Sequence, residues 1–259
     1  MSKKHEVAVK KETTPVAAVD VAAWGEQFVG ATDIIIPKIL PMQGLSELVT
    51  DGKAVMGEFR DSVSGEKMGS IAEPIAIIPF HIQKFWDIME EDSEGDFKWV
   101  KSEPLIENPL DKGYNDNLPW TDKVDGVEIK RIRRMNFFCM VPSETAKGND
   151  IPYIISFKST SLREGKKLFT QMFVRNKKAG LPPCAFTFAL SGVKQKNDKG
   201  TFIVPTVTMG PKATPEEMNQ AFYWYQQINK GIVKVDDSDL EREATPSYGE
   251  EDASGTGEF

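Results

Sequence analysis

The sequence contains little cysteine and little histidine, and this scarcity excludes several kinds of site. Its 259 residues include two cysteines, Cys139 and Cys184, and two histidines, His5 and His81. Two cysteines cannot form a disulfide framework, and we expect both to be buried free thiols, as suits a reducing cytoplasm. Two histidines and two distant cysteines do not supply a zinc site or a Cys–His or Ser–His catalytic pair. The sequence therefore predicts no metal, no cofactor and no enzymatic activity.

Long hydrophobic runs are also absent. The longest apolar stretches, IIIPKIL and IAIIPF, are too short to cross a bilayer. The N-terminus carries lysines but lacks the continuous apolar block of a signal peptide. We therefore expect no membrane association and a cytoplasmic location.

Charge is distributed very unevenly along the chain. The formal net charge is −7, yet residues 236–259 alone carry nine acids and one base. Residues 31–128 hold 20 acids and 9 bases, whereas residues 129–200 hold 15 bases and 4 acids. Such asymmetry suggests a polyanionic partner for the basic part. The alternative is that the acidic and basic parts pair with each other across the folded surface.

Composition divides the chain into three segments. Residues 1–22 are predicted to be a flexible N-terminal arm, and residues 23–235 a single folded domain, whose binding function is inferred below. Residues 236–259 have no apolar periodicity and cannot bury enough surface to offset the entropy of ordering, so a disordered acidic tail is predicted. An acidic tail of this kind can present itself to a basic partner, and its last residue, Phe259, adds a ring that can fill a pocket.

The domain shows many short strand patterns and two helical patterns. Residues 104–126 are expected to form a long irregular loop. The clearest strands are expected over 127–142, 151–160 and a hairpin at 184–209. This order predicts a mainly β protein with helices (α+β), either a sandwich or an oligonucleotide-binding (OB)-fold-like barrel with an inserted helix and a C-terminal helix.

The two helices are predicted from their start signals. Ser161 and Glu164 form a capping-box pattern for a helix that ends near Gly180. Thr214 and Pro215 begin the second helix, which extends to residue 230.

Cations and aromatic residues alternate in the basic part, which is what single-stranded nucleic acid requires. Cations neutralise phosphates, and exposed rings stack with unpaired bases at roughly 1–3 kcal/mol each. The alternative is that many of these rings are core and that the helix lysines form an ordinary solvated face. Trp86 and Trp99, from the acidic part, are weaker stacking candidates. The predicted DNA-binding residues are Arg131, Arg133, Arg134, Phe138, Tyr153, Phe157, Lys158, Arg163, Lys166, Lys167 and Arg175.

Two other patterns in the sequence favour ordinary surface structure over a site. Residues 163–167 are similar to a phosphate loop but lack its earlier glycine and its hydroxyl residue. Residues 87–96 are rich in carboxylates, and Asp92 and Glu94 could hold a nuclease metal ion. Because this stretch lacks a metal-ligand rhythm, a solvated acidic loop is favoured.

The combination of basic domain and acidic tail resembles the single-stranded DNA-binding proteins of tailed bacteriophages, whose tails end in phenylalanine. Residues 36–66 and 152–172 share the resemblance. It implies an OB-type barrel, protection of unwound DNA in replication or recombination, and a location in the host-cell cytoplasm. It also implies a tail that recruits replication or recombination proteins and competes with DNA for the basic groove. The matching tail residues are Glu250, Glu251, Asp252, Glu258 and Phe259.

The leading hypothesis is therefore a sequence-independent single-stranded DNA-binding protein without catalytic turnover. The alternative is a phage structural or assembly protein, a homo-oligomer whose oppositely charged surfaces pair between copies. A metal-dependent nuclease that uses the acidic stretch is the third hypothesis.

Overall fold

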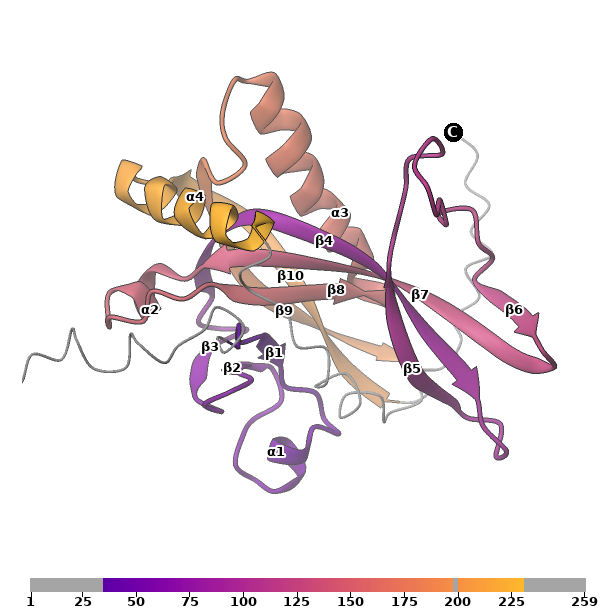
Figure 1. Ribbon diagram of the computed structural model, residues 1–259. Helices are drawn as coiled ribbons and strands as arrows, with labels where there is room; N and C mark the ends of the chain where they lie inside the picture. The colour runs from indigo at the N-terminus through magenta and orange to yellow at the C-terminus, as the bar shows by residue number, and fades with distance from the viewer. Residues whose placement is uncertain (1–34, 198–199, 231–259) are drawn as a thin grey trace, which may run out of the picture.

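The computed structural model describes residues 35–197 and 200–230 (Figure 1). The expected N-terminal arm and the acidic tail, including the matching tail residues, lie outside these ranges.

The described chain is mostly β with a few helices. A three-stranded sheet contains β1 (Ile39–Pro41), β2 (Glu58–Asp61) and β3 (Lys67–Ser70). A seven-stranded sheet contains all the other strands, and every pairing between named strands is antiparallel. Its members are β4 (Ile75–Glu91), β5 (Phe97–Pro104), β6 (Thr121–Val124), β7 (Val127–Met140), β8 (Tyr153–Lys158), β9 (Phe186–Asn197) and β10 (Gly200–Lys212).

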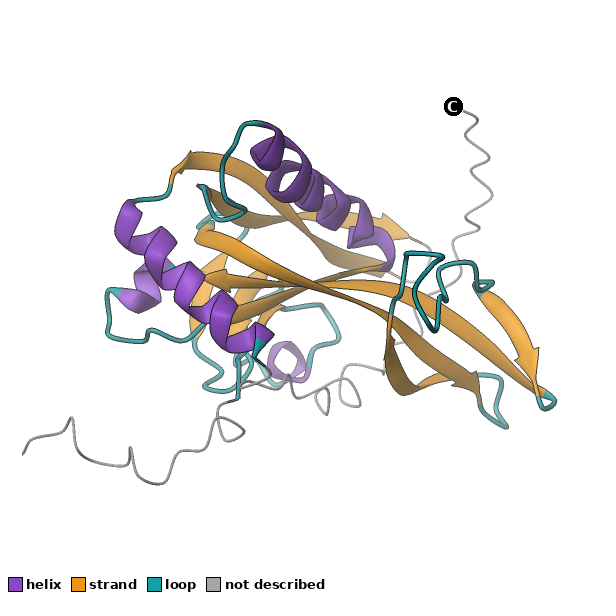
Figure 2. Cartoon of the chain, turned by 45° about the horizontal axis from the view of Figure 1, so that its top comes forward, coloured by secondary structure: helices purple, strands orange, loops and turns teal. Residues whose placement is uncertain are grey.

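The long strands β4 and β7 form the spine of the large sheet, and each changes its outer neighbour half-way along. The first part of β4 pairs with β9 and its later part with β5. The first part of β7 pairs with β6 and its later part with β8. We call the part containing β8, β9 and β10 the body, and the part containing β5 and β6 the wing. Figure 2 shows that both long helices lie over the body.

The sheets do not close into a barrel, so the expected OB fold is not confirmed. Within the large sheet, β10 pairs with β9 alone and β8 with β7 alone. The strands of the wing extend beyond the body instead of curling back toward β10 (Figure 1). The expected order of the helices is confirmed, because one long helix lies between β8 and β9 and the other follows β10.

The first long helix consists of α3 (Leu162–Phe169) and a π-helical continuation, η4 (Thr170–Asn176). The predicted capping box at its start is wrong. Ser161 lies in a 3-10 turn (Ser159–Ser161), where its Oγ accepts a hydrogen bond from the Lys158 backbone N–H at 2.9 Å. The hydroxyl is therefore engaged with the preceding strand and does not cap α3.

The second long helix, α4 (Pro215–Asn229), begins as predicted. Thr214 Oγ1 accepts from the Glu217 backbone N–H at 3.2 Å, and Glu217 Oε2 accepts from the Thr214 backbone N–H at 2.7 Å. This reciprocal pair satisfies two donors at the helix start. Two short helices, α1 (Glu47–Thr50) and α2 (Pro142–Thr145), complete the described elements.

The body has a core on each face of the sheet. Neighbouring strand residues point to opposite faces. Thus Phe137 contributes to the core beneath α3, whereas Phe138 contributes to the core beneath α4. Because both faces are covered, the end of β7 is a continuous buried run.

Both cysteines are buried free thiols, as predicted, and burial raises the pKa of each. None of the helices in the described part of the chain is long and apolar enough to span a membrane.

Candidate nucleic-acid interface

Three arginines that were expected to hold phosphates are instead engaged within the protein. Arg131 is 8% exposed, forms an ion pair with Asp122 at 3.3 Å and donates to the Pro119 carbonyl at 3.1 Å. Arg133 forms an ion pair with Asp116, and its guanidinium carbon lies 4.9 Å from the centre of the Trp86 ring. These contacts fasten the 104–126 segment to β7.

Arg134 is fully buried at the junction between body and wing. Its Nε donates to Asp87 Oδ1 at 3.0 Å, and its Nη2 donates to Ser102 Oγ at 2.9 Å. The Ser102 hydroxyl in turn donates to Asp87 at 2.7 Å. The structure thus supports the alternative for these three strand arginines: each pairs with a carboxylate from the acidic part of the chain. A phosphate could reach them only by displacing their carboxylate partners.

The rings that were expected to stack with bases belong to the core. Phe138, Tyr153 and Phe157 are at most 1% exposed. Phe137 and Phe157 pack edge to face at 5.6 Å between their ring centres. Trp86 is also buried, and Trp99 donates to Ser102 Oγ at 3.3 Å. Strand residues must bury one face, and here both faces of β7 and β8 are covered.

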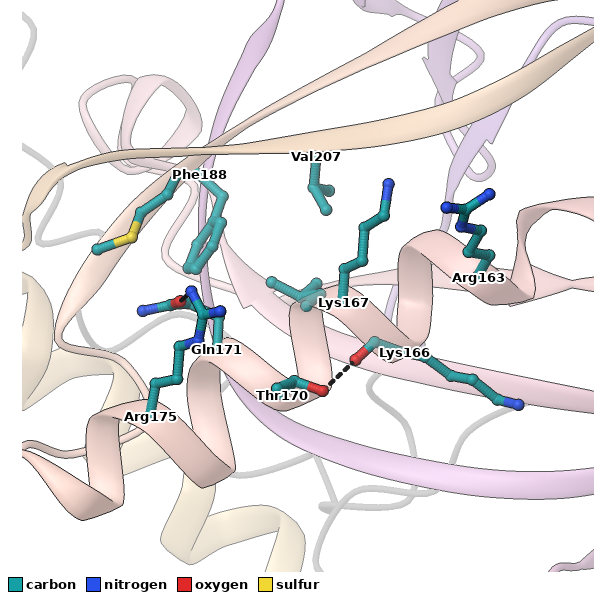
Figure 3. Close-up of a pocket in the computed structure, with 10 residues that line it drawn as sticks. Arg163, Lys166, Lys167, Thr170, Gln171, Arg175, Phe188 and Val207 are labelled. Carbon is teal, nitrogen blue, oxygen red and sulfur yellow. Dashed lines mark hydrogen bonds between the residues drawn. The ribbon is translucent and has the colours of Figure 1, made fainter. Parts of the chain in front are cut away.

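Four of the predicted cationic residues do come together. They line one open groove of about 480 Å³, which lies between the first long helix and the β9–β10 hairpin (Figure 3). We call it the cationic groove. Its cations are Arg163, Lys166, Lys167 and Arg175. Its other lining residues are Leu168, Thr170, Gln171, Phe188, Val207 and Met209.

The helix sequence explains why the cations face outward. Leu162, Leu168 and Met172 are buried against the sheet, which leaves the cationic positions between them exposed. Gly165 allows this close approach, since an added Cβ would lie 2.8 Å from the Cβ of Phe157. The helix thus lies directly on β8 and presents its basic side along the hairpin.

Most of the positive charge in the groove is not neutralised by ion pairs with the described carboxylates. Lys167 pairs with Glu164 at 2.5 Å. Among the described residues, neither Arg163 nor Lys166 has a carboxylate partner, and Arg175 makes only a 3.5 Å hydrogen bond to Gln171. Among residues 35–197 and 200–230, no acidic residue lines the groove. It therefore offers several cations to a polyanion above an apolar floor.

The π-helical segment forms one end of the groove. Gln171 and Arg175 lie on it, and its last residue, Asn176, is buried. Asn176 Nδ2 lies 3.3 Å from both the Pro182 and the Pro183 carbonyl oxygens, to which it donates. π-helical turns are rare and occur frequently at functional sites.

Lys158 ends β8 next to the 3-10 turn and does not line the groove. The sequence did not predict six of the groove residues. Leu168, Thr170 and Gln171 come from the helix, and Phe188, Val207 and Met209 come from the hairpin. The hairpin itself was predicted, and Phe188 lies opposite Met209 in the β9–β10 register. The alternating pattern of the hairpin strands did not indicate that the first long helix would lie beside these hairpin residues.

In the acidic stretch of residues 87–96, Asp92 has a structural role. Asp92 pairs with Lys98 at 2.7 Å and accepts hydrogen bonds from the backbone N–H groups of Glu94 and Asp96. Lys98, together with these N–H groups, lowers the pKa of Asp92 to about 2. Within residues 35–197 and 200–230, no group of three or more His, Cys, Asp or Glu side chains is placed to hold a metal ion.

Comparison with known proteins identifies a family of phage proteins. The model of a family described as Pam3 phage gp34-like protein matches residues 8–234, which is most of the chain. No curated protein and no solved structure matches it.

Proposed function

The chain belongs to the Pam3 phage gp34-like family of phage proteins, and we propose that it binds single-stranded DNA without sequence preference and without catalytic turnover. In this proposal it protects unwound DNA during phage replication or recombination in the host-cell cytoplasm. The observation that carries the proposal is the cationic groove, where four cations lie above an apolar floor and none of the described residues that line it is acidic.

The chemistry of the groove favours single-stranded over double-stranded DNA. Cations along a groove can neutralise successive phosphates of a flexible strand. The apolar floor, which includes Phe188 and Met209, suits bases that are not already stacked in a duplex. In this proposal the groove on an open sheet replaces the expected barrel as the binding surface, and the strand arginines take no part in it.

The acidic tail has a second role in the proposal. Residues 236–259 carry a net charge of −8, from nine acids and one base. We propose that this segment recruits replication or recombination proteins and competes with DNA for the groove as an intramolecular polyanion.

The proposal is tested by fluorescence anisotropy with labelled oligo(dT) and a duplex of the same length. We expect tighter binding to oligo(dT), and weaker binding after Arg163→Gln. Lys147→Gln is the matched control, because Lys147 is exposed on the C-terminal side of α2, pairs with Glu144 and does not line the groove. Equal affinity for the duplex, or an equal effect of the two variants, would refute the proposal.

A further inference from the structure

A second cavity, of about 270 Å³, adjoins the cationic groove. Lys166 and Thr170 line both hollows, so these lie on either side of one turn of the first long helix. Figure 3 shows the Lys166 side chain pointing away from Arg163 and Lys167. A strand that lies in the groove, as proposed above, would therefore pass the mouth of the second cavity.

The walls of the second cavity are largely apolar. Leu105 comes from the segment after β5, Met135 from β7, and Leu162 and Phe169 from α3. The other lining residues are polar or charged, namely Lys84, Glu107, Arg133, Arg134, Lys166 and Thr170. Apolar surface with polar groups placed among it occurs in sites that take a small, flat organic group.

The Phe169 ring offers a stacking surface there. It is only partly buried, and its ring centre lies 5.3 Å from that of Phe173. Lys84, which also lines the cavity, holds its ammonium nitrogen 4.3 Å from the centre of the Phe169 ring. A cation in this position interacts with the π-face, which shows that this face is turned toward the cavity.

The charges around the second cavity are nearly balanced. Lys84 pairs with Glu107, and Arg133 and Arg134 have the carboxylate partners described above. Lys166, at the edge shared with the groove, is the one lining cation without a carboxylate partner among the described residues. A phosphate is thus drawn to the groove, whereas the second cavity suits an uncharged aromatic group.

We propose that the second cavity receives one base of the bound strand, which stacks on Phe169 while the neighbouring phosphates lie in the cationic groove. This inference rests on the proposed function. Entry of the base moves the Lys84 ammonium off the ring, and Lys84 keeps Glu107 as its partner. Phe169 takes the stacking role that the sequence had suggested for the buried rings.

The test compares two ligands of equal phosphate number, oligo(dT) and an oligomer of abasic sites. The wild-type protein is expected to bind oligo(dT) about tenfold or more tightly than the abasic oligomer. Phe169→Leu should reduce this preference severalfold and leave the affinity for the abasic oligomer unchanged. Phe173→Leu is the matched control, because Phe173 packs beside Phe169 but lines neither hollow. It should keep the wild-type preference.

The outcomes separate this inference from the proposed function. If the wild-type protein binds both oligomers equally, the base site is refuted while DNA binding stands. If Phe169→Leu keeps the full preference, the base stacks elsewhere and the assignment is refuted. If neither oligomer binds, both proposals fail. The wild-type comparison needs no variant, so equal binding of the two oligomers refutes the base site even if Phe169→Leu does not fold.

Discussion

Replacing Lys166 should weaken the salt dependence of DNA binding by a calculable amount. Lys166 lies where the two hollows meet and has no carboxylate partner among the described residues. Each phosphate neutralised on a single strand contributes about 0.7 to the slope of log affinity against log salt. If all four groove cations contact phosphates, the slope is about −2.8, and affinity falls roughly 50-fold between about 50 and 200 mM salt.

Lys166→Met removes one of these contacts and keeps the aliphatic stem. The slope should then be about −2.1, so affinity falls only roughly 20-fold over the same range. Fluorescence anisotropy with oligo(dT) at four or more salt concentrations measures both slopes. Lys147→Met, outside the groove, should leave the slope unchanged. A wild-type slope near zero, or identical slopes for wild type and Lys166→Met, would refute the assignment of phosphates to the groove.

Three further predictions concern stability and the tail. Gly165→Ala should lower the free energy of unfolding, measured in urea, by about 1–2 kcal/mol, because overpacking against β8 outweighs the roughly 1 kcal/mol gain in helix propensity. A urea unfolding midpoint equal to or higher than that of the wild type would contradict the close packing. Asp87→Asn removes the carboxylate that pairs with the buried Arg134 and should lower the free energy of unfolding by about 3–5 kcal/mol in the same measurement. A decrease of less than about 1 kcal/mol would argue against the ion pair. Deleting residues 236–259 should raise the affinity for oligo(dT) in anisotropy titrations, and an unchanged or lower affinity would argue against competition by the tail.

Local patterns predicted the elements of the body well. The two long helices, the β9–β10 hairpin and the order of these elements follow from periodicity and turn residues that are close in sequence. Whether the sheet closes into a barrel cannot be predicted from such local patterns. It depends on how far β4 and β7 run together, and their pairing extends from Ile78 opposite Met140 to Glu90 opposite Ile129. This length creates the wing and leaves the sheet open.

The site was predicted in part for a similar reason. The cations of α3 alternate with apolar residues at helical spacing, so their exposure was foreseeable from the sequence. The partners of the strand arginines were not, because they come from other segments. The β4–β7 and β6–β7 registers bring Asp87 and Asp122 close, and Asp116 comes from the irregular segment between β5 and β6. The same alternation of cations and rings fits both an exposed binding face and a buried ion-pair network.

The π-helical turn makes the geometry of the groove depend on the number of residues in the helix. A π turn holds one residue more than an α turn, so removing one residue between Thr170 and Asn176 would favour an uninterrupted α-helix whose flanking residues keep their faces. Arg163 and Arg175 would then both stay on the side of the helix that faces the hairpin. A deletion within α3 that left the π turn in place would instead rotate Arg175 by about 100° away from the hairpin and shorten the span of positive charge along the groove.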